Sequence, residues 1–418
     1  MFSLLNIRVG WYLALRQIKR SSRWATVLII FVMLLTFLNL VVVTGILVGL
    51  IEGINDSYRT QYVGDVIISS LETKNYIENS PSIISFLTSL PQVDRIAARY
   101  VESGVADANY KTRTDPNDKS NSTGAQFAGI DPIAEDRFSN LSRYMLEGEY
   151  LAPDDYDKVL VGHQLLSEYS FGDQPGLTTL KGVKVGSKLR ITIGSAQREV
   201  TVKGVLKSKI GELSVRMFMV DTQFRGLIGR SDYNVAEIAV KLHDGNDPAA
   251  FRDFLLNSDI GRFGKIKTFI ESIPPGVADI KSTFAMLGNM ISSIGLVVAS
   301  ITIFIVIFIN ALTRRKFIGI LKGIGIKGEA IEISYMIQSF FYATCGSAVG
   351  LLVLYGVLVP LIAAHPIDFP FSDGILVAPI PDTLARIALL VFSTIIAGYI
   401  PARMIVRKNT LDSILGRK

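Results

Sequence analysis

The sequence predicts a membrane protein: a four-helix transmembrane bundle plus a large α+β extracytoplasmic domain inserted between the first and second spans. Hydrophobic residues make up 49% of the 418-residue chain and charged residues only 19%, against about 25% charged residues in typical soluble domains. Long uncharged stretches lie towards both ends, whereas the middle of the chain has the composition of a soluble domain. Lysine and arginine gather beside the uncharged stretches, as the positive-inside rule describes.

Charge and cysteine content exclude several other classes. The net charge of +6 and the pI of about 9.2 would suit a nucleic-acid-binding protein. Membrane topology accounts better for the positions of these charges, so no nucleic-acid partner is expected. The single cysteine, Cys345, lies inside an uncharged stretch, which excludes a disulfide framework and zinc sites with several cysteine ligands.

Four segments are apolar enough to span a membrane, since a bilayer core of ~30 Å needs about 20 mostly apolar residues. The first three are residues 25–51, 284–312 and 333–364, which contain no charge. The fourth, residues 383–404, has Arg386 and Arg403 near its ends, and both side chains are expected to extend to the membrane interface. The first stretch is about twice as long as a signal-peptide core and no Ala-x-Ala-like site follows it, so a retained anchor is expected.

The distribution of basic residues predicts the orientation of a multi-pass protein of the plasma (inner) membrane. Residues 1–24, the loop 313–332 and the tail 405–418 are rich in lysine and arginine, whereas the loop 365–382 has neither. Basic segments stay in the cytoplasm. Both termini and the loop 313–332 are therefore predicted inside, and residues 52–283 and the short loop 365–382 outside.

The leader, residues 1–24, is predicted to form a cytoplasmic amphipathic helix. Its apolar residues recur at three- and four-residue spacing: Leu4, Ile7, Trp11, Leu15 and Ile18. A basic helix with such a face lies in the membrane interface, in contact with lipid. The alternative is a plain positively charged flank that sets the topology.

Residues 52–283 have the pattern of an α+β domain. Short runs rich in Val and Ile predict strands at residues 65–68, 188–193, 199–205, 216–220 and 235–242. Helices are predicted at residues 81–90, 162–169 and 247–256, and a mobile polar loop at residues 111–124.

Catalytic chemistry is scarce in this domain. His163 and His243 have no companions at metal-ligand spacing, so both are expected to be surface or packing residues. The acidic cluster Asp154, Asp155 and Asp157 lacks the spacing of a calcium loop and is interpreted as a solvated turn. No phosphate-binding loop and no Ser-His-Asp arrangement is present. The chain is therefore expected to be non-catalytic and to bind no cofactor, metal or ATP itself.

The loop 313–332 combines basic residues with an apolar stripe formed by Phe317, Ile320, Leu321 and Ile324. Such a segment can form a short helix along the inner membrane surface that docks on a partner, or can act only as a topology-setting basic loop.

This loop resembles the inner loop of the FtsX/MacB-like ABC permease family, which includes the lipoprotein-releasing permeases. The residues that carry the resemblance are Arg314, Arg315, Lys316, Ile318, Gly319, Ile320, Leu321, Lys322 and Gly325. Thr313 and Phe317 stand where the family usually has glutamates, so no salt bridge of those glutamates is transferred. Pro401, Ala402 and Arg403 are similar to the family's tail motif, although Thr410 replaces its second proline.

The resemblance implies a permease subunit with a MacB-like core domain. Each inner loop of a permease pair, identical or not, would dock on a cytoplasmic ABC ATPase that holds ATP and Mg²⁺. The motion would be transmitted to the outer domains, which export or release a lipoprotein, lipid, peptide or hydrophobic drug. The alternative is a membrane-anchored receptor or scaffold, similar to FtsX-type regulators of cell-wall hydrolases, that transports nothing.

Small and polar residues inside the spans predict helix contacts. Gly45 and Gly49, and likewise Gly346 and Gly350, have the spacing that lets helices approach closely. Each pair can serve a dimer contact or packing within one chain. Asn39, Asn289, Asn310 and Gln338 are expected to bond across helices rather than to line a path.

Overall fold

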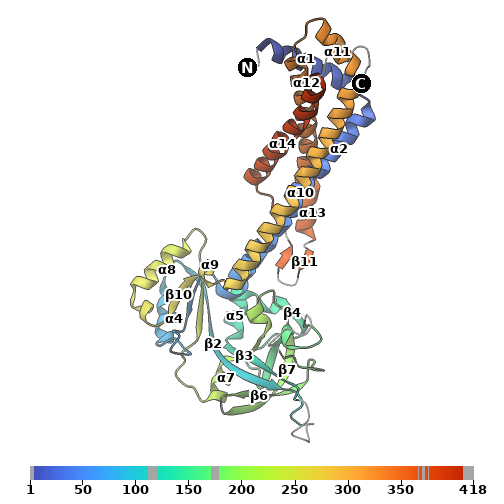
Figure 1. Ribbon diagram of the computed structural model, residues 1–418. Coiled ribbons are helices and arrows are strands. Elements are labelled where there is room, and N and C mark those ends of the chain that lie inside the picture. The colour runs from blue at the N-terminus through green and yellow to red at the C-terminus, as the bar shows by residue number, and fades with distance from the viewer. Residues whose placement is uncertain are drawn as a thin grey trace. The chain divides into compact units, whose positions relative to one another are not determined.

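The computed structural model describes residues 4–111, 120–170, 178–365, 367–369, 372–374 and 376–407. The chain divides into two compact units. The helical unit comprises Met1–Ile51, Asp279–Asp368 and Asp373–Lys418, and the α+β unit comprises Glu52–Ala278 and Phe369–Ser372. Figure 1 labels several elements of each unit.

Four helices are long and apolar enough to cross a membrane, namely Arg23–Val63, Ser282–Thr313, Gly328–Ala364 and Ile380–Val406. The first joins α2 (Arg23–Leu38), the π-helical η1 (Asn39–Val43), α3 (Thr44–Tyr58) and the π-helical η2 (Arg59–Val63). The second lies in α10 (Pro275–Thr313). The third joins α12 (Gly328–Val353), the π-helical η6 (Leu354–Leu358) and α13 (Val359–Ala364), and the fourth is α14 (Ile380–Val406). Each predicted span lies inside one of these helices.

The core of the helical unit forms where α12 packs on α2 and α14. Met33, Phe37 and Tyr335 are buried in this core together with residues of α10. Glycines make the close crossings possible. A Cβ on Gly346 would contact Met33, a Cβ on Gly350 would contact Phe37, and a Cβ on Gly398 would contact Ser339. Gly45 packs against the carbonyl oxygen of Val377, and Gly49 is also buried. Three of the four glycines singled out in the sequence therefore contact other segments of the same chain.

The α+β unit is built on a ten-stranded mixed sheet in the order β10-β1-β9-β2-β3-β8-β5-β7-β4, with β6 paired to β2 and β7. The strands are β1 (Val66–Ser69), β2 (Val93–Asp107), β3 (Ser122–Ile130), β4 (Met145–Gly148), β5 (Lys158–Gly162), β6 (Lys188–Ile193), β7 (Ala196–Leu206), β8 (Arg216–Val220), β9 (Glu237–Leu242) and β10 (Lys265–Thr268). The long strand β2 pairs with β9 through its first half and with β3 and β6 through its second half. β2 therefore connects the two halves of the sheet.

Helices cover the sheet at several places. The helices of this unit are α4 (Ser80–Ser89), α5 (Pro132–Ser139), α6 (Gly211–Ser214), α7 (Asp221–Ile228), α8 (Pro248–Asn257) and α9 (Phe269–Ser272). Ile83 of α4 and Leu255 of α8 share a buried cluster with Val66 and Ile266, so these two helices cover the end of the sheet formed by β10, β1 and β9 (Figure 1). Separately, β11 (Ile367–Phe369) pairs with β12 (Ser372–Gly374).

Most elements predicted in residues 52–283 are confirmed to within a few residues, as β1, β6, β7, β8, β9, α4 and α8 show. The helix predicted at residues 162–169 is wrong, because β5 ends at Gly162 and only a short 3₁₀ turn, His163–Leu165, follows. The predicted mobile loop is partly wrong, since Ser122 begins β3; its residues 112–119 lie outside the described residues. The prediction missed the long strand β2.

The acidic cluster is not simply a solvated turn, because Asp155 is buried. Its carboxylate forms ion pairs of 2.6 Å with Lys158 and with Lys203, and accepts a hydrogen bond of 2.8 Å from the backbone N–H of Ala152. Burial alone would raise the pKa of Asp155, but the hydrogen bonds from Ala152, Lys158 and Lys203 lower it to about 2. Asp155 is therefore a structural ion-pair centre.

Acidification is expected to weaken the α+β unit through Asp155. Its folded pKa of about 2 lies below the ~3.9 of an unfolded aspartate, so its contribution is complete above pH ~4 and is lost as the pH falls through 2. Asp155→Asn should cost roughly 1 kcal/mol at pH 7, since the half-exposed Lys158 is screened by water, and almost nothing near pH ~1, below the folded pKa. Urea unfolding at both pH values tests this, with the exposed Asp154→Asn as control. An equal loss at both pH values would contradict it.

Candidate functional site

The basic loop of the helical unit forms a short helix, α11 (Arg315–Gly323), which begins where Arg314 leaves helical geometry with φ −99° and ψ 13°. One side of α11 is held in the core. Ile318 is 3% exposed and Leu321 is 7% exposed, and both contact the cluster that includes Ile331 and Val406. This packing fixes α11 against α12 and α14.

The other side of α11 carries an exposed apolar stripe, defined here as Phe317, Ile320 and Ile324. Their exposed fractions are 50%, 52% and 71%, and Lys316 is exposed beside them. The stripe predicted from the sequence also contained Leu321, and that assignment is wrong because Leu321 turns into the core with Ile318. Arg314 and Arg315 are only partly exposed. The stripe and Lys316 therefore form the accessible surface of α11.

Gly325 makes the turn that joins α11 to α12. Its φ is +97°, a backbone conformation that only glycine adopts without strain. The N–H of Gly325 donates to the carbonyl oxygen of Lys322 at 3.1 Å, and that of Ile326 donates to Leu321 at 3.0 Å. These bonds satisfy the last carbonyl groups of α11, as in a Schellman-type helix end.

The tail motif lies beside this loop. Lys322 Nζ donates to the carbonyl oxygen of Val406 at 2.9 Å, at the end of α14. Pro401 and Ala402 are buried, and Arg403 Nη1 donates to the Tyr399 hydroxyl at 2.7 Å. The structure thus brings together the two segments that carry the family resemblance. Lys322 and Arg403 are engaged within the chain, whereas Lys316 remains at the surface.

The leader helix, α1 (Leu4–Arg20), packs on α12 through small and polar residues. Asn6 Nδ2 donates to Glu329 Oε2 at 2.8 Å, and Gln338 of α12 donates to Gln17, which confirms the predicted cross-helix role of Gln338. A Cβ on Gly10 would lie 2.7 Å from Ile333 Cγ2. The predicted apolar face stays exposed at Leu4, Ile7, Trp11 and Leu15. The sequence therefore indicated the free face of α1 and missed its packing face, which has little apolar character.

Within the described ranges, no group of three or more His, Cys, Asp or Glu side chains could hold a metal ion. His163 is a packing residue, and its burial lowers the pKa of the imidazole. The helical unit thus contains four helices long and apolar enough to cross a membrane, and its α11 exposes an apolar stripe.

Comparison with protein-family models gives two matches that together cover most of the chain. The MacB-like periplasmic core domain matches residues 26–256, and the FtsX-like permease C-terminal model matches residues 289–410. The chain belongs to the FtsX/MacB-type family of ABC transporter permeases. Members of this family are membrane-embedded and work with a cytoplasmic ABC ATPase.

Two solved structures resemble part of the chain. The periplasmic region of MacB from Actinobacillus actinomycetemcomitans is 16% identical, with 52% of this chain and 90% of that chain covered and a TM-score of 0.33. The extracellular domain of the noncanonic ABC-type transporter YknZ from Gram-positive bacteria is 14% identical. The match covers 49% of this chain and 97% of that chain, with a TM-score of 0.31. No curated protein matches the sequence.

Proposed function

We propose that this chain is a non-catalytic permease subunit that transmits the motion of a partner ATPase to its outer domain, for export or release of cargo. In this arrangement both termini and α11 face the cytoplasm, and the outer domain lies between the first and second spans. The observation that carries the proposal is the exposed stripe Phe317, Ile320 and Ile324 on a helix whose opposite side is locked in the core.

The contacts of α11 suit the transmission of force. Ile318 and Leu321 pack in the helical core, Lys322 bonds to the end of α14, and Gly325 leads directly into α12. A displacement of α11 by a docked partner is therefore passed to two long helices at once. The exposed stripe supplies apolar area for docking, and Lys316 supplies a charge that an acidic rim on the partner can pair with.

In the α+β unit, the last turn of the first long helix is hydrogen-bonded to the sheet. Tyr62, in η2, donates its hydroxyl hydrogen to Glu237 of β9 at 2.9 Å, and its backbone carbonyl accepts from Arg99 of β2 at 2.8 Å. This end of the helix is thus bound to the central strands of the sheet. Motion of this helix end would therefore reach strands β2 and β9.

The remaining parts of the proposal follow from the family. ATP and Mg²⁺ are held by the ATPase, a second permease chain completes the transporter, and α1 places its apolar face, including Trp11, in the lipid interface. Cargo of the classes lipoprotein, lipid, peptide or hydrophobic drug would be moved by the outer domain, in release or efflux. The competing function is a receptor or scaffold that regulates a cell-wall hydrolase.

Changing the stripe is expected to abolish ATPase capture. Phe317→Ser, Ile320→Ser and Ile324→Ser together should reduce the ATPase that co-purifies with the tagged chain at least about tenfold, because interface cores lose about 1–2 kcal/mol per apolar anchor. These side chains are exposed, so the fold should survive. Purification in mild detergent with quantitative mass spectrometry measures the effect.

The matched control changes one Phe and two Ile residues that are exposed on the α+β unit, Phe254, Ile133 and Ile270, to Ser. It should capture as much ATPase as the wild type. Lys316→Glu alone tests the surface charge, without the partly buried Arg314 and Arg315. Capture of a cell-wall hydrolase with no ATPase would favour the regulator, and equal ATPase capture by both triple variants would refute docking through α11.

A further inference from the structure

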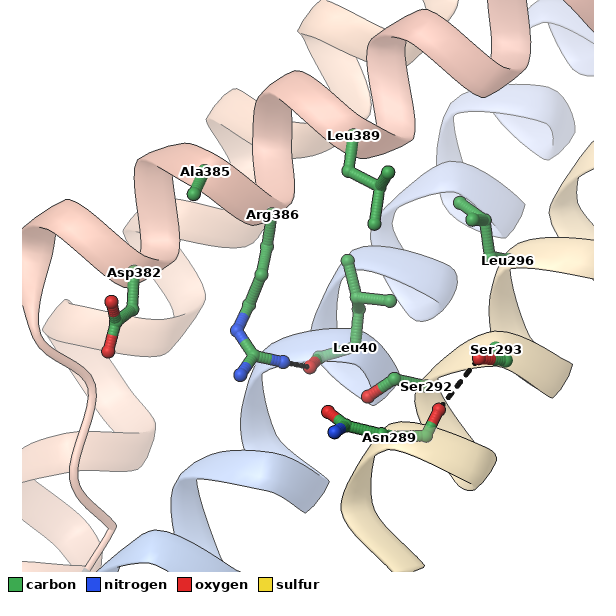
Figure 2. A pocket seen from close by; sticks show the side chains of 9 residues that line it. All are labelled: Leu40, Asn289, Ser292, Ser293, Leu296, Asp382, Ala385, Arg386 and Leu389. Carbon is green, nitrogen blue, oxygen red and sulfur yellow. Dashed lines mark hydrogen bonds between the residues drawn. The ribbon is translucent and has the colours of Figure 1, made fainter. Parts of the chain in front are cut away.

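Two cavities, together called the groove, lie along α10 and α14 of the helical unit, and the polar one has a volume of about 480 Å³. Figure 2 shows Arg386 and Asp382 reaching this cavity from α14, and Asn289, Ser292 and Ser293 from α10. Leu296 and Leu389 close its other side. A positive charge, a negative charge, hydroxyl groups and an amide thus converge on one space between membrane-type helices.

Arg386 is held in place by the first long helix. Its Nη1 donates to the Leu40 carbonyl oxygen at 2.7 Å and to Thr44 Oγ1 at 2.8 Å. Leu40 lies in the π-helical η1, where the wider turn changes the regular pattern of backbone hydrogen bonds. The side chain of Arg386 therefore turns towards η1, and its extension to the membrane interface stays a prediction.

The guanidinium keeps further donors for a ligand. Both of its hydrogen bonds use Nη1, so Nε and Nη2 have no hydrogen-bond partner among the described residues. Asp382 lies one helical turn before Arg386 on α14, and the described part of the chain shows no ion pair between them. The cavity therefore presents two separate opposite charges rather than a neutralised pair.

The second cavity, of about 410 Å³, is mainly apolar and is lined by Ile301, Phe304, Ile396 and Ile400. It begins about one turn beyond Leu296 and Leu389. From Arg386 to Ile400 the helix rises ~21 Å at ~1.5 Å per residue, which exceeds the ~15 Å depth of one leaflet. The groove is thus charged at one end and apolar along a length that accommodates an acyl chain.

We propose that this groove binds one zwitterionic phospholipid of the phosphatidylethanolamine type. The phosphate would accept hydrogen bonds from Arg386 Nε and Nη2, and the side-chain N–H of Asn289 would donate to one of its remaining oxygens. The Ser293 hydroxyl already donates to the Asn289 backbone carbonyl oxygen at 2.8 Å, so Ser293 only shapes the cavity. The ammonium group would lie at Asp382, and one acyl chain would follow Leu389 to Ile400. The negative charge of Asp382 disfavours a purely anionic headgroup, so the two charges together select for an ammonium beside a phosphate.

Native mass spectrometry of the full-length chain, reconstituted in nanodiscs of defined lipid and then released, tests the proposal. Phosphatidylethanolamine, phosphatidylglycerol and diacylglycerol are the probes. The wild type should retain one phosphatidylethanolamine in preference to both other lipids. Arg386→Gln should lower that retention about tenfold, because the phosphate loses its charged hydrogen-bond donors. Asp382→Asn should shift the preference towards phosphatidylglycerol.

Because Arg386→Gln also removes the contacts to η1, a second variant leaves that anchor intact. Ser293→Phe fills the cavity from α10 and should abolish retention, whereas Ser282→Phe, exposed on α10 outside the cavity, should retain lipid like the wild type. Equal retention by Ser293→Phe and Ser282→Phe would overturn the proposal. Equal retention of diacylglycerol would show that no headgroup is recognised, and displacement by inorganic phosphate alone would point to a free anion instead; either result would also overturn it.

Discussion

Arg99→Met is expected to destabilise the α+β unit by about 3–5 kcal/mol, the usual cost of removing one partner of a buried ion pair. The Arg99 side chain has no exposed surface, and its guanidinium forms a bidentate pair with Glu135 at 2.8 and 2.7 Å. Glu135 is itself only 2% exposed. Removal of the arginine would leave a buried carboxylate without its counter-charge.

The loss should extend beyond one pair, because Arg99 belongs to a network of buried polar groups. Arg216, which is 2% exposed, pairs with Glu237 at 3.1 Å and donates to Gln126 at 3.0 Å. The Tyr62 ring lies 5.2 Å from the Arg99 guanidinium and 5.4 Å from that of Arg216. The network therefore links η2 with β2, β3, β8 and β9. Loss of one of its side chains is expected to weaken the attachment of the helix end to the sheet.

Hydrogen exchange of the full-length protein measures the loss of stability caused by Arg99→Met, separately for the strands and for η2. Arg262→Met is the control, because Arg262 pairs with Asp259 at the exposed surface, and exposed pairs contribute about 0–1 kcal/mol. The double variant Arg99→Met with Glu135→Leu should recover part of the loss, since it removes both charges. A loss no larger than that of Arg262→Met, or no recovery in the double variant, would contradict the predicted role.

The network shows why part of this fold could not be predicted. The long helices follow from composition alone, because any uncharged run of sufficient length in a membrane must form backbone hydrogen bonds within itself. Strand β2 carries Arg95, Arg99 and Glu102 among its apolar residues, which gives it the pattern of a surface segment. Its buried Arg99 is tolerated because α5 places Glu135 against it as a counter-charge. That contact depends on the topology of the sheet, which the local sequence does not reveal.

The candidate site, too, was only partly predictable from the sequence. The basic loop, its apolar stripe and the tail motif were visible as local patterns, and the structure places them side by side. The inward turn of Leu321 and the position of Arg386 were not predictable, because each depends on another helix. Arg386 in particular bonds to a carbonyl group in a π-helical turn, and no residue pattern around Leu40 signals that turn.

Gly346→Leu is expected to prevent correct packing of the helical unit, with a loss of stability above about 3 kcal/mol, because overpacking at a backbone crossing forces two helices apart. A Cβ at this position would meet the Met33 side chain and lie 3.1 Å from the backbone nitrogen of Leu34. Neither neighbour can move unless α2 moves. Thermal unfolding in detergent, followed by size-exclusion chromatography, measures the folded fraction.

Gly356→Leu is the matched control, since Gly356 belongs to the same long helix but has no heavy atom within 4 Å of a built Cβ. It should unfold close to the wild-type temperature. The comparison also decides between the two roles that the glycine spacing allowed. If Gly346→Leu stays folded as a single chain but no longer pairs with a second permease, the glycine serves a dimer contact. If the single chain itself loses its fold, the close approach of α12 to α2 requires this glycine, and the dimer surface must lie on other residues.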